Sequence, residues 1–253
     1  MTTARRRLDQ RMVDQGLAPS RARAQAMIRA GAVLIAGVPA TRAASTAEGS
    51  ITVDADPCPW VSRAALKLDH ALDHFALAPH GVAADIGAST GGFTQVLLAR
   101  GASRVYAVDV GRDQLHPSLL DDPRVVDLSA TNARTLNGDV LPPLEWIVSD
   151  VSFISLGKAL GPVLSLARPG AMMVALIKPQ FEAGPGRVGK GGIVRDPAIH
   201  TEARNGVRHL LTDAGWSVLG ETESPITGSD GNREFLIAAR RSGAPRPGDH
   251  LTV

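Results

Sequence analysis

The chain has 253 residues, 44% of them hydrophobic, and its 27 lysines and arginines nearly balance 25 acids. The composition is that of an ordinary globular protein. The chain is long enough for one full α/β domain with a small companion domain. The single cysteine, Cys58, excludes an intrachain disulfide framework and a cysteine-based zinc site, so we expect a cytoplasmic protein without a metal.

The formal net charge of +2 is distributed unevenly along the chain. Residues 1–46 contain eight arginines against Asp9 and Asp14 and balance at +6, whereas residues 47–253 balance at −4. Basic charge gathered at one end is typical of a segment that binds nucleic acid. No stretch reaches the ~18 apolar residues of a membrane helix, and no secretory signal is recognised, so we expect no membrane span.

Two short helices and a hairpin are predicted for the first forty residues. Residues 7–17 carry one apolar stripe, and a second helix begins after Ser20, a good N-cap, and ends at Gly31. Residues 32–40 then indicate a strand, a tight turn and a short second strand. A small α+β unit is therefore expected here.

The basic residues of this unit favour RNA as its ligand. Arg21 and Arg23 fall in the first turn of the second helix, where cations oppose the helix dipole, so we expect an anion to bind there. The order of elements and the sequence SRARAQAMIRAGAVLIAG are similar to the S4 RNA-binding domain. A solvated basic helix face is the alternative. The arginines assigned to RNA are Arg5, Arg6, Arg7, Arg21, Arg23 and Arg29.

The resulting domain prediction has four parts. The S4-like domain covers residues 1–50, a linker covers 51–62, a larger domain covers 63–245, and a flexible tail covers 246–253. Prolines on both sides of Cys58 keep the linker extended.

The larger domain alternates strands with helices. Strands are predicted at 82–86, 104–110, 124–128, 145–151 and 171–178, and helices at 62–75, 93–100, 155–167 and 197–214. This alternation predicts a mostly parallel, doubly wound sheet of the Rossmann-like α/β class. Residues 216–224 and 233–241 should close it as an antiparallel edge.

A glycine-rich turn follows the first strand of this sheet. Gly87, Gly91 and Gly92 let the backbone turn sharply and approach a ligand, but their G-x-x-x-G-G spacing differs from the dinucleotide fingerprint. Asp109 ends the next strand, about twenty residues further on, where a ribose hydroxyl pair is usually bound. The two features predict an adenosine site that suits S-adenosylmethionine. Glycines that serve only the turn are the alternative.

Charged residues follow several apolar strands. Burying Asp150 or Lys178 alone would cost several kcal/mol, so we expect the two to be paired or to line a cleft. Glu234 begins the last strand, and if that strand is antiparallel it lies at the same edge as the ends of the others. With Lys67 from the preceding helix, two lysines and two acids surround one cleft. A purely structural ion-pair network is the alternative.

Residues 184–192, GPGRVGKGG, nearly match a phosphate-binding P-loop. Gly191 replaces the hydroxyl residue that would bind Mg²⁺, and no helix follows at once, so this interpretation is rejected. We expect instead a loop over the RNA, in which Arg187, Lys190 and Arg195 contact phosphates.

The motifs GASTGGFT, VDVG, TNAR, SDVSFISL, IKPQFE, GRVGKGGIVRDP and NREFL follow the S4-like segment in order. This arrangement resembles the TlyA family, bacterial FtsJ-like ribosomal RNA 2′-O-methyltransferases that carry an S4 domain and are also called haemolysin A proteins. The resemblance covers nearly the whole chain. It implies a class I methyltransferase fold, S-adenosylmethionine as cofactor, and methyl transfer to a cytidine ribose 2′-hydroxyl of ribosomal RNA, within ribosomal subunits.

The resemblance also implies residue roles. The family's Lys-Asp-Lys-Glu tetrad would fall on Lys67, Asp150, Lys178 and Glu234. The cofactor residues would be Asp85, Gly87, Ala88, Ser89, Gly91, Gly92, Asp109 and Asn132. A sulfonium methyl is a good electrophile and a ribose hydroxyl a poor nucleophile, so the enzyme mainly orients the hydroxyl. Lys178 could accept or direct its proton, and the sequence leaves the protonation of Lys178 open.

Two other functions are compatible with parts of the sequence. A membrane-active haemolysin would need an apolar span or a strongly amphipathic basic helix, and the sequence shows neither. An RNA-binding protein with an inactive methyltransferase fold would not need the complete tetrad, whose presence favours the enzyme.

Overall fold

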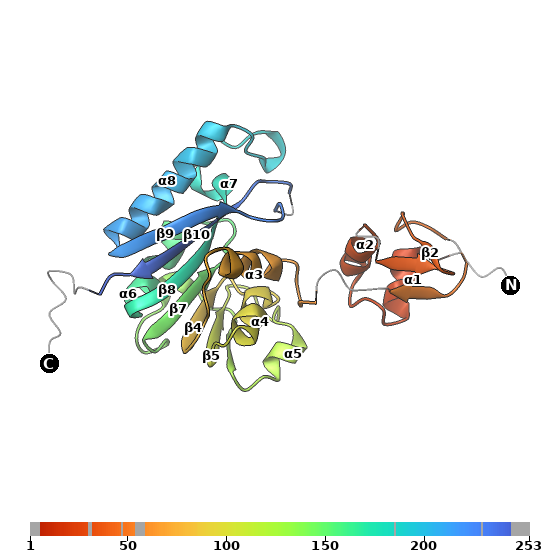
Figure 1. Cartoon of the computed structure of the whole chain (residues 1–253), viewed down its shortest axis with the longest axis horizontal. Coiled ribbons are helices and arrows are strands. Elements are labelled where there is room, and N and C mark those ends of the chain that lie inside the picture. The colour runs from red at the N-terminus through yellow and green to blue at the C-terminus, as the bar shows by residue number, and fades with distance from the viewer. Residues whose placement is uncertain are drawn as a thin grey trace. The chain divides into compact units, whose positions relative to one another are not determined.

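The computed structural model describes residues 6–29, 32–46, 48–53, 59–184, 186–228 and 230–243. The chain divides into two compact units, Met1–Pro59 and Trp60–Val253 (Figure 1). The expected flexible tail, residues 246–253, lies outside the described residues. Within the described ranges, no helix is long and apolar enough to cross a bilayer.

The first unit packs two helices on a three-stranded sheet. It contains α1 (Leu8–Asp14), α2 (Arg21–Arg29), β1 (Val33–Ile35), β2 (Val38–Pro39) and β3 (Ile51–Val53), with strand order β2-β1-β3. Leu8 and Met12 of α1 pack in one buried apolar cluster with Val33 of β1.

The prediction that residues 51–53 belong to a linker is wrong. Ile51–Val53 form β3, which pairs antiparallel with β1, and the Ile51 side chain is buried in the core of this unit. A three-residue strand is too short to show the alternation of a strand in the sequence. It is stabilised by a partner strand that lies far earlier in the chain.

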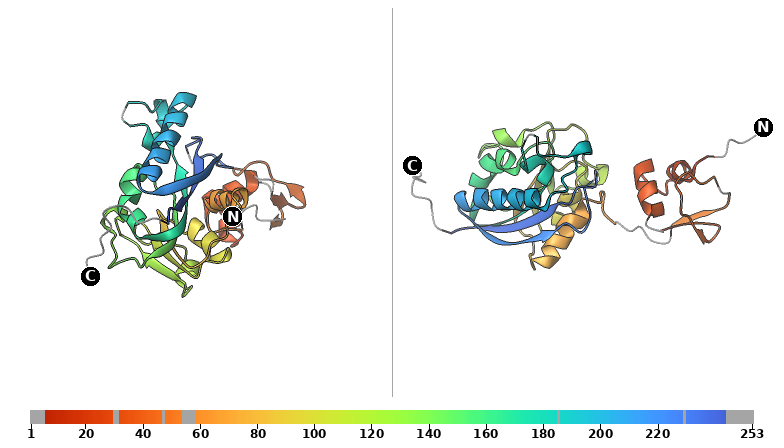
Figure 2. Two further views of the ribbon diagram at one scale, coloured as in Figure 1. Left: turned by 60° about the vertical axis from the view of Figure 1, so that its left-hand side comes forward. Right: turned by 90° about the horizontal axis from the view of Figure 1, so that it is seen from above.

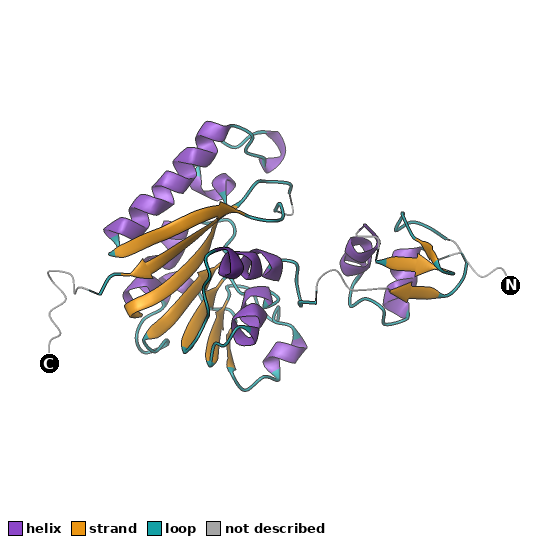
Figure 3. Cartoon of the chain, in the orientation of Figure 1, coloured by secondary structure: helices purple, strands orange, loops and turns teal. Residues whose placement is uncertain are grey.

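The second unit contains a seven-stranded sheet of order β6-β5-β4-β7-β8-β10-β9 (Figure 3). Its strands are β4 (Val82–Ile86), β5 (Arg104–Val108), β6 (Val125–Leu128), β7 (Leu144–Ser149), β8 (Ala167–Ile177), β9 (Trp216–Glu223) and β10 (Phe235–Arg241). Its helices are α3 (Ala65–His74), α4 (Gly92–Ala99), α5 (Pro117–Leu120), α6 (Leu156–Ser165), α7 (Pro179–Glu182) and α8 (Pro197–Asp213), with short 3₁₀ turns η1 (Ala133–Thr135) and η2 (Lys190–Gly192).

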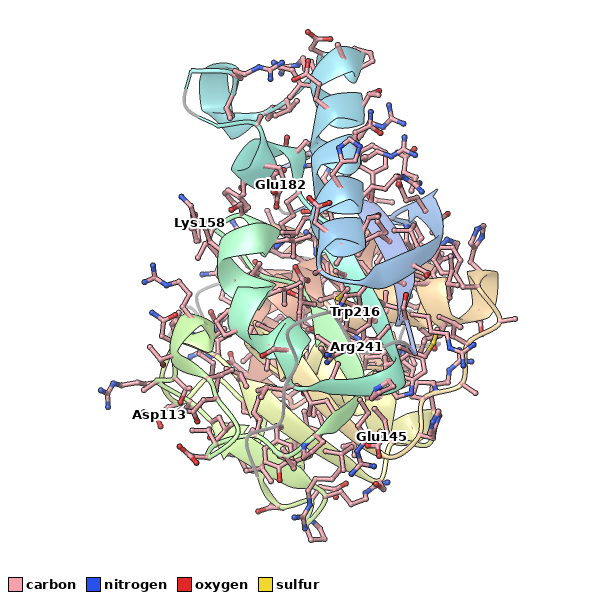
Figure 4. All side chains as sticks on the ribbon, turned by 90° about the vertical axis from the view of Figure 1, so that its left-hand side faces the viewer. Asp113, Glu145, Lys158, Glu182, Trp216 and Arg241 are labelled. Atoms are coloured by element: carbon pink, nitrogen blue, oxygen red, sulfur yellow. The ribbon has the colours of Figure 1, made fainter. Side chains whose placement is uncertain are left out.

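Helices cover both faces of this sheet (Figure 2). α6 and α8 pack on one face with Trp216, and α3 and α4 pack on the other. Arg241 of β10 donates hydrogen bonds to the Leu164 and Ser165 carbonyls at the end of α6, at 3.1 and 3.0 Å (Figure 4). These carbonyls have no partner within the helix, so the guanidinium satisfies them.

The predicted mostly parallel, doubly wound sheet is confirmed. β4 to β8 run parallel to one another, and β10 is antiparallel to β8, with Phe235 opposite Ile177. The beginning of β10 therefore lies at the edge where the parallel strands end. The expected antiparallel edge is confirmed, because β9 pairs antiparallel with β10; β10 lies between β8 and β9, so β9 is the edge strand.

Candidate active site

The glycine turn after β4 lies where β7 approaches closely. Gly87 has φ +89°, and a Cβ there would lie 2.9 Å from the Asp150 backbone oxygen. A side chain would force the two strand ends apart, so glycine is required at this position. Gly91, with φ +90°, precedes α4; a Cβ there would meet Leu115 and Leu119, not a cavity.

A cavity of about 460 Å³ opens beside this turn, within the size range of ligand pockets. Asp109 lies at its wall: Oδ2 accepts a hydrogen bond from Ser89 N at 2.8 Å, and Oδ1 accepts one from Gly111 N at 2.7 Å. Asn132 also lines it, although its Oδ1 caps η1 by accepting from Arg134 N at 3.1 Å. The apolar wall includes Val108, Val110 and Ile154.

A second cavity of about 270 Å³ shares Gly87 and Ser89 with the first. All four predicted tetrad residues line it: Lys67, Asp150, Lys178 and Glu234. They come from α3, the end of β7, the end of β8 and the segment before β10. The strand register places the last three at one edge of the sheet.

The tetrad forms a continuous chain of charges. Lys67 Nζ lies 2.6 Å from Glu234 Oε2 and 3.8 Å from Asp150 Oδ2, and Lys178 Nζ lies 2.6 Å from Asp150 Oδ1. Lys178 also donates a hydrogen bond to Ser152 Oγ at 2.7 Å. The two lysines and Glu234 are more than nine-tenths buried. Buried charges persist only when paired, and here each charge has an opposite partner.

Comparisons with known proteins agree with this geometry. Residues 60–241 match the FtsJ-like methyltransferase family, and residues 6–50 match the S4 domain. The chain belongs to the FtsJ-like methyltransferase family. The 16S/23S rRNA (cytidine-2′-O)-methyltransferase TlyA of Mycobacterium tuberculosis is 44% identical over 93% of this chain and 90% of its own.

Two further relatives cover almost the whole chain. Hemolysin A of Brachyspira hyodysenteriae is 40% identical over 91% of this chain and 98% of its own. A solved structure from Streptococcus thermophilus, provisionally assigned as a hemolysin, is 37% identical with a TM-score of 0.75, over 95% of this chain and 90% of that one. The expected membership of the TlyA group of FtsJ-like methyltransferases is therefore confirmed.

The structure does not support a direct cofactor contact by Asp85. Its side chain is fully buried, lines neither cavity, and accepts a hydrogen bond from Thr94 Oγ1 of α4 at 2.7 Å. Burial raises the pKa of Asp85 to about 7, an effect that the Thr94 hydrogen bond opposes and the nearby Asp150 charge increases. Within the methyltransferase domain, Asp85 binds α4 to β4.

The other predicted cofactor residues divide between the cavities. Gly87 and Ser89 line both, Asp109 and Asn132 line the first, and Ala88 and Gly92 line the second. Gly91 lines neither, so the structure supports for it only the role in the turn.

An anion is expected near the arginines at the start of α2, and the structure places the carboxylate of Asp9 beside Arg21. Asp9 Oδ2 lies 3.2 Å from Arg21 and accepts hydrogen bonds from Gln25 at 2.7 Å and Arg7 at 3.1 Å. The hydrogen bond from Arg7 is the main cause that holds the pKa of Asp9 far below its usual range. The Asp9 side chain is inaccessible to solvent because the side chains that bind it cover it. Both arginines stay about half exposed and can still meet phosphates.

The remaining RNA predictions are only partly described. Arg6 pairs with Asp14 at 2.8 Å, and Arg187 pairs with Glu202. These arginines are exposed, and exposed pairs contribute about 0–1 kcal/mol, so such pairs do not prevent phosphate contacts. Arg23 donates its backbone N–H to the Ser20 N-cap at 3.2 Å. Arg5 and the side chains of Arg29 and Lys190 lie outside the described structure.

Ser152 is a site residue that the sequence analysis missed. Its hydroxyl accepts the hydrogen bond from Lys178, and it lines both cavities. It follows Asp150 by two residues in SDVSF, so a search for short polar residues just beyond each strand could have found it. Within the described residues, no group of histidine, cysteine, aspartate and glutamate side chains could hold a metal ion.

Proposed function

We propose that this protein uses S-adenosylmethionine to methylate the ribose 2′-hydroxyl of a cytidine in ribosomal RNA, within assembled ribosomal subunits in the cytoplasm. The observation that carries the proposal is the Lys67–Glu234–Asp150–Lys178 cluster, whose cavity shares Gly87 and Ser89 with the cofactor cavity. The relative named a 16S/23S rRNA (cytidine-2′-O)-methyltransferase supports the choice of substrate.

The first cavity fits S-adenosylmethionine by its chemistry. Asp109 is fixed by two backbone N–H groups, and its carboxylate keeps lone pairs for a ribose hydroxyl pair. Val108, Val110 and Ile154 offer the apolar walls that an adenine ring needs. Gly87 lines both cavities, so the methionine portion of the cofactor would lie near the tetrad. The residues present therefore fit the cofactor.

The bound cofactor supplies an electrophilic methyl group on a sulfonium. The tetrad's task would be to orient the ribose hydroxyl so that its oxygen faces this methyl group. Lys178 Nζ, fixed between Asp150 and Ser152, accepts or directs the proton of that hydroxyl. Lys67, whose Nζ lies 3.8 Å from Asp150 and 2.6 Å from Glu234, keeps both carboxylates in place. Alignment of the reacting atoms accounts for most of the expected rate gain.

The S4 unit accounts for binding of the RNA. Asp9 orders Arg7 and Arg21, which remain half exposed. Ordered but exposed guanidinium groups suit phosphate contacts, which position RNA without reading its sequence. We assign RNA affinity largely to this unit and target choice to the folded RNA that it engages.

Methyl transfer to isolated ribosomal subunits tests the proposal. Purified protein, isotope-labelled S-adenosylmethionine and subunits should give labelled RNA, with the label on a cytidine 2′-oxygen after nuclease digestion and mass spectrometry. RNA carrying 2′-deoxycytidine at the labelled position should accept none. Label on a base, or none on either subunit, would refute the proposal.

Lys178→Ala should reduce turnover by about 10²-fold or more while leaving cofactor and RNA affinities nearly unchanged. The matched control is Lys158→Ala, which removes an exposed lysine of α6 outside the tetrad and should keep normal turnover. If Lys178→Ala loses activity only in proportion to lost RNA binding, Lys178 contacts phosphate and the proposed mechanism fails.

A further inference from the structure

Glu234 is confined on two sides. Its Oε2 lies 2.6 Å from Lys67 Nζ. A Cβ added at Gly228 would lie 2.5 Å from its Oε1 and 3.1 Å from its carboxyl carbon, so the backbone at Gly228 packs directly against the second oxygen. A glutamate side chain has several rotatable bonds, and contacts on both sides restrict the carboxylate to one position.

The turn that contains Gly228 is closed by backbone hydrogen bonds. Gly228 N donates to the Asn232 carbonyl at 2.9 Å, and Gly231 N donates to the Gly228 carbonyl at 3.0 Å. The Asn232 side chain is 1% exposed and bonds outside the turn. Its Oδ1 accepts from Val194 N at 2.9 Å, and its Nδ2 donates to the Gly192 carbonyl at 2.9 Å.

Asn232 therefore joins the Gly228 turn, made by Gly228 and residues 230–232, to the glycine loop, residues 186–194. The end of this loop has a second anchor, because His200 Nε2 of α8 lies 3.0 Å from the Val194 carbonyl and the His200 ring is 5% exposed. The earlier part of the loop carries Arg187 and Lys190, which are predicted to contact RNA.

We infer that Asn232 is a positioning residue for methyl transfer: it holds the glycine loop against the Gly228 turn, and through Gly228 this turn fixes the Glu234 carboxylate on Lys67. The inference rests on the proposed function. The buried Asn232 amide orders the backbone next to the Glu234 carboxylate. It also orders the end of the glycine loop, whose earlier residues are predicted to contact RNA. Leaving its backbone partners unpaired would let both segments shift.

Two substitutions separate the steps of this arrangement. Asn232→Ala removes both bonds to the glycine loop. Gly228→Ala leaves those bonds in place but puts a methyl group where Glu234 Oε1 lies; the φ of Gly228 lies outside the left-handed region, so the backbone accepts alanine. The matched controls are Asn137→Ala and Gly138→Ala in the loop before β7. Asn137 is exposed, its side-chain Oδ1 accepts a hydrogen bond from Asp139 N at 3.0 Å, and a Cβ at Gly138 meets nothing within 4 Å.

The experiment measures single-turnover methylation of ribosomal subunits with the full-length protein. Gly228→Ala and Asn232→Ala should each slow methyl transfer by at least about tenfold, because small misplacements of catalytic groups cost that much or more. The cofactor dissociation constant should change by less than about twofold, and the apparent KM for RNA should rise only for Asn232→Ala. Both controls should match the wild type.

If Asn232 and Gly228 had only a structural role, their substitutions would lower the methylation rate of the Glu234→Gln variant as much as that of the wild type. If Asn232 and Gly228 act through the carboxylate, adding either substitution to Glu234→Gln should cost less than about threefold more, because linked residues are non-additive. Full multiplication of the losses, or normal rates for both single variants, would overturn the inference. An inactive wild-type protein would instead refute the proposed function. Gly228→Ala remains decisive if Asn232→Ala fails to fold.

Discussion

Replacing Asp85 by asparagine should stabilise the methyltransferase domain, and by more at pH 8 than at pH 5. Asp85 is fully buried in β4, its Oδ2 accepts the Thr94 hydrogen bond, and its Oδ1 has no hydrogen-bond partner among the described residues. Burial raises the pKa of the Asp85 carboxyl to about 7. Asparagine keeps an acceptor for Thr94 and carries no charge.

The size and sign of this pH-dependent stability difference follow from the number of protons that the folded and unfolded chains bind. In an unfolded chain an aspartate titrates near pH ~3.9, so between that value and about 7 the folded protein binds more protons than the unfolded one. Stability therefore falls as the pH rises through this window. The full difference is about three pKa units, or on the order of 4 kcal/mol. The loss of stability from ionising Asp85 is absent below about pH 4 and complete above about pH 7. Asp85→Asn does not suffer this loss, because asparagine does not ionise.

Urea denaturation followed by tryptophan fluorescence measures the difference. The chain's three tryptophans, Trp60, Trp146 and Trp216, all belong to the second unit, so the signal reports on this domain alone. The stability gain of Asp85→Asn should increase by roughly 2–3 kcal/mol between pH 5 and pH 8. Asp139→Asn, at an exposed loop position, should show no such trend. A gain independent of pH, or a loss at pH 8, would refute the reasoning.

Two other substitutions test the binding units. Asp109→Ala should weaken S-adenosylmethionine binding by about 1–3 kcal/mol in calorimetric titration, because it removes a charged acceptor; an unchanged isotherm would place the ribose contact elsewhere. Asp9→Asn should speed amide hydrogen exchange in α1 and α2 at pH 7, whereas Asp14→Asn, in an exposed pair, should have little effect. Because the pKa of the folded-state Asp9 carboxyl is depressed, its stabilisation begins to decline as the pH falls below about 4, and variant and wild type should converge only below the much lower folded-state pKa.

The tetrad could be located from the sequence because strand ends in a parallel sheet meet at one edge. Asp150 and Lys178 directly follow their strands, and the antiparallel β10 brings Glu234 to the same edge. Their catalytic roles stay a prediction.

The structure gives the Asp85 side chain another partner than the predicted cofactor, because nearness to a strand end does not tell which face of the sheet a side chain lies on. Ala84 and Ile86 face α6 and α8, and Ala83 faces α3 and α4, so alternation along β4 directs Asp85 toward Thr94 of α4.

The ion pair between Asp9 and Arg21 depends on contact between two helices, which spacing within one helix does not show. Arg21 looked misplaced at the start of α2 because its partner belongs to α1. The β3 strand was missed for a similar reason: its stability comes from pairing with β1, not from its own three residues. In each case the missing information was a tertiary contact.

The position of β10 determines when the enzyme can become active during its synthesis. Because β10 lies between β8 and β9, the earlier strand β9 cannot take its place at the sheet edge until β10 has left the ribosome. Glu234 precedes β10 directly, so the same late segment completes both the sheet and the tetrad. A nascent chain that ends before Glu234 would carry the entire S4 unit without the carboxylate that completes the tetrad. With RNA binding assigned to the S4 unit as proposed, RNA binding would mature before methyl transfer.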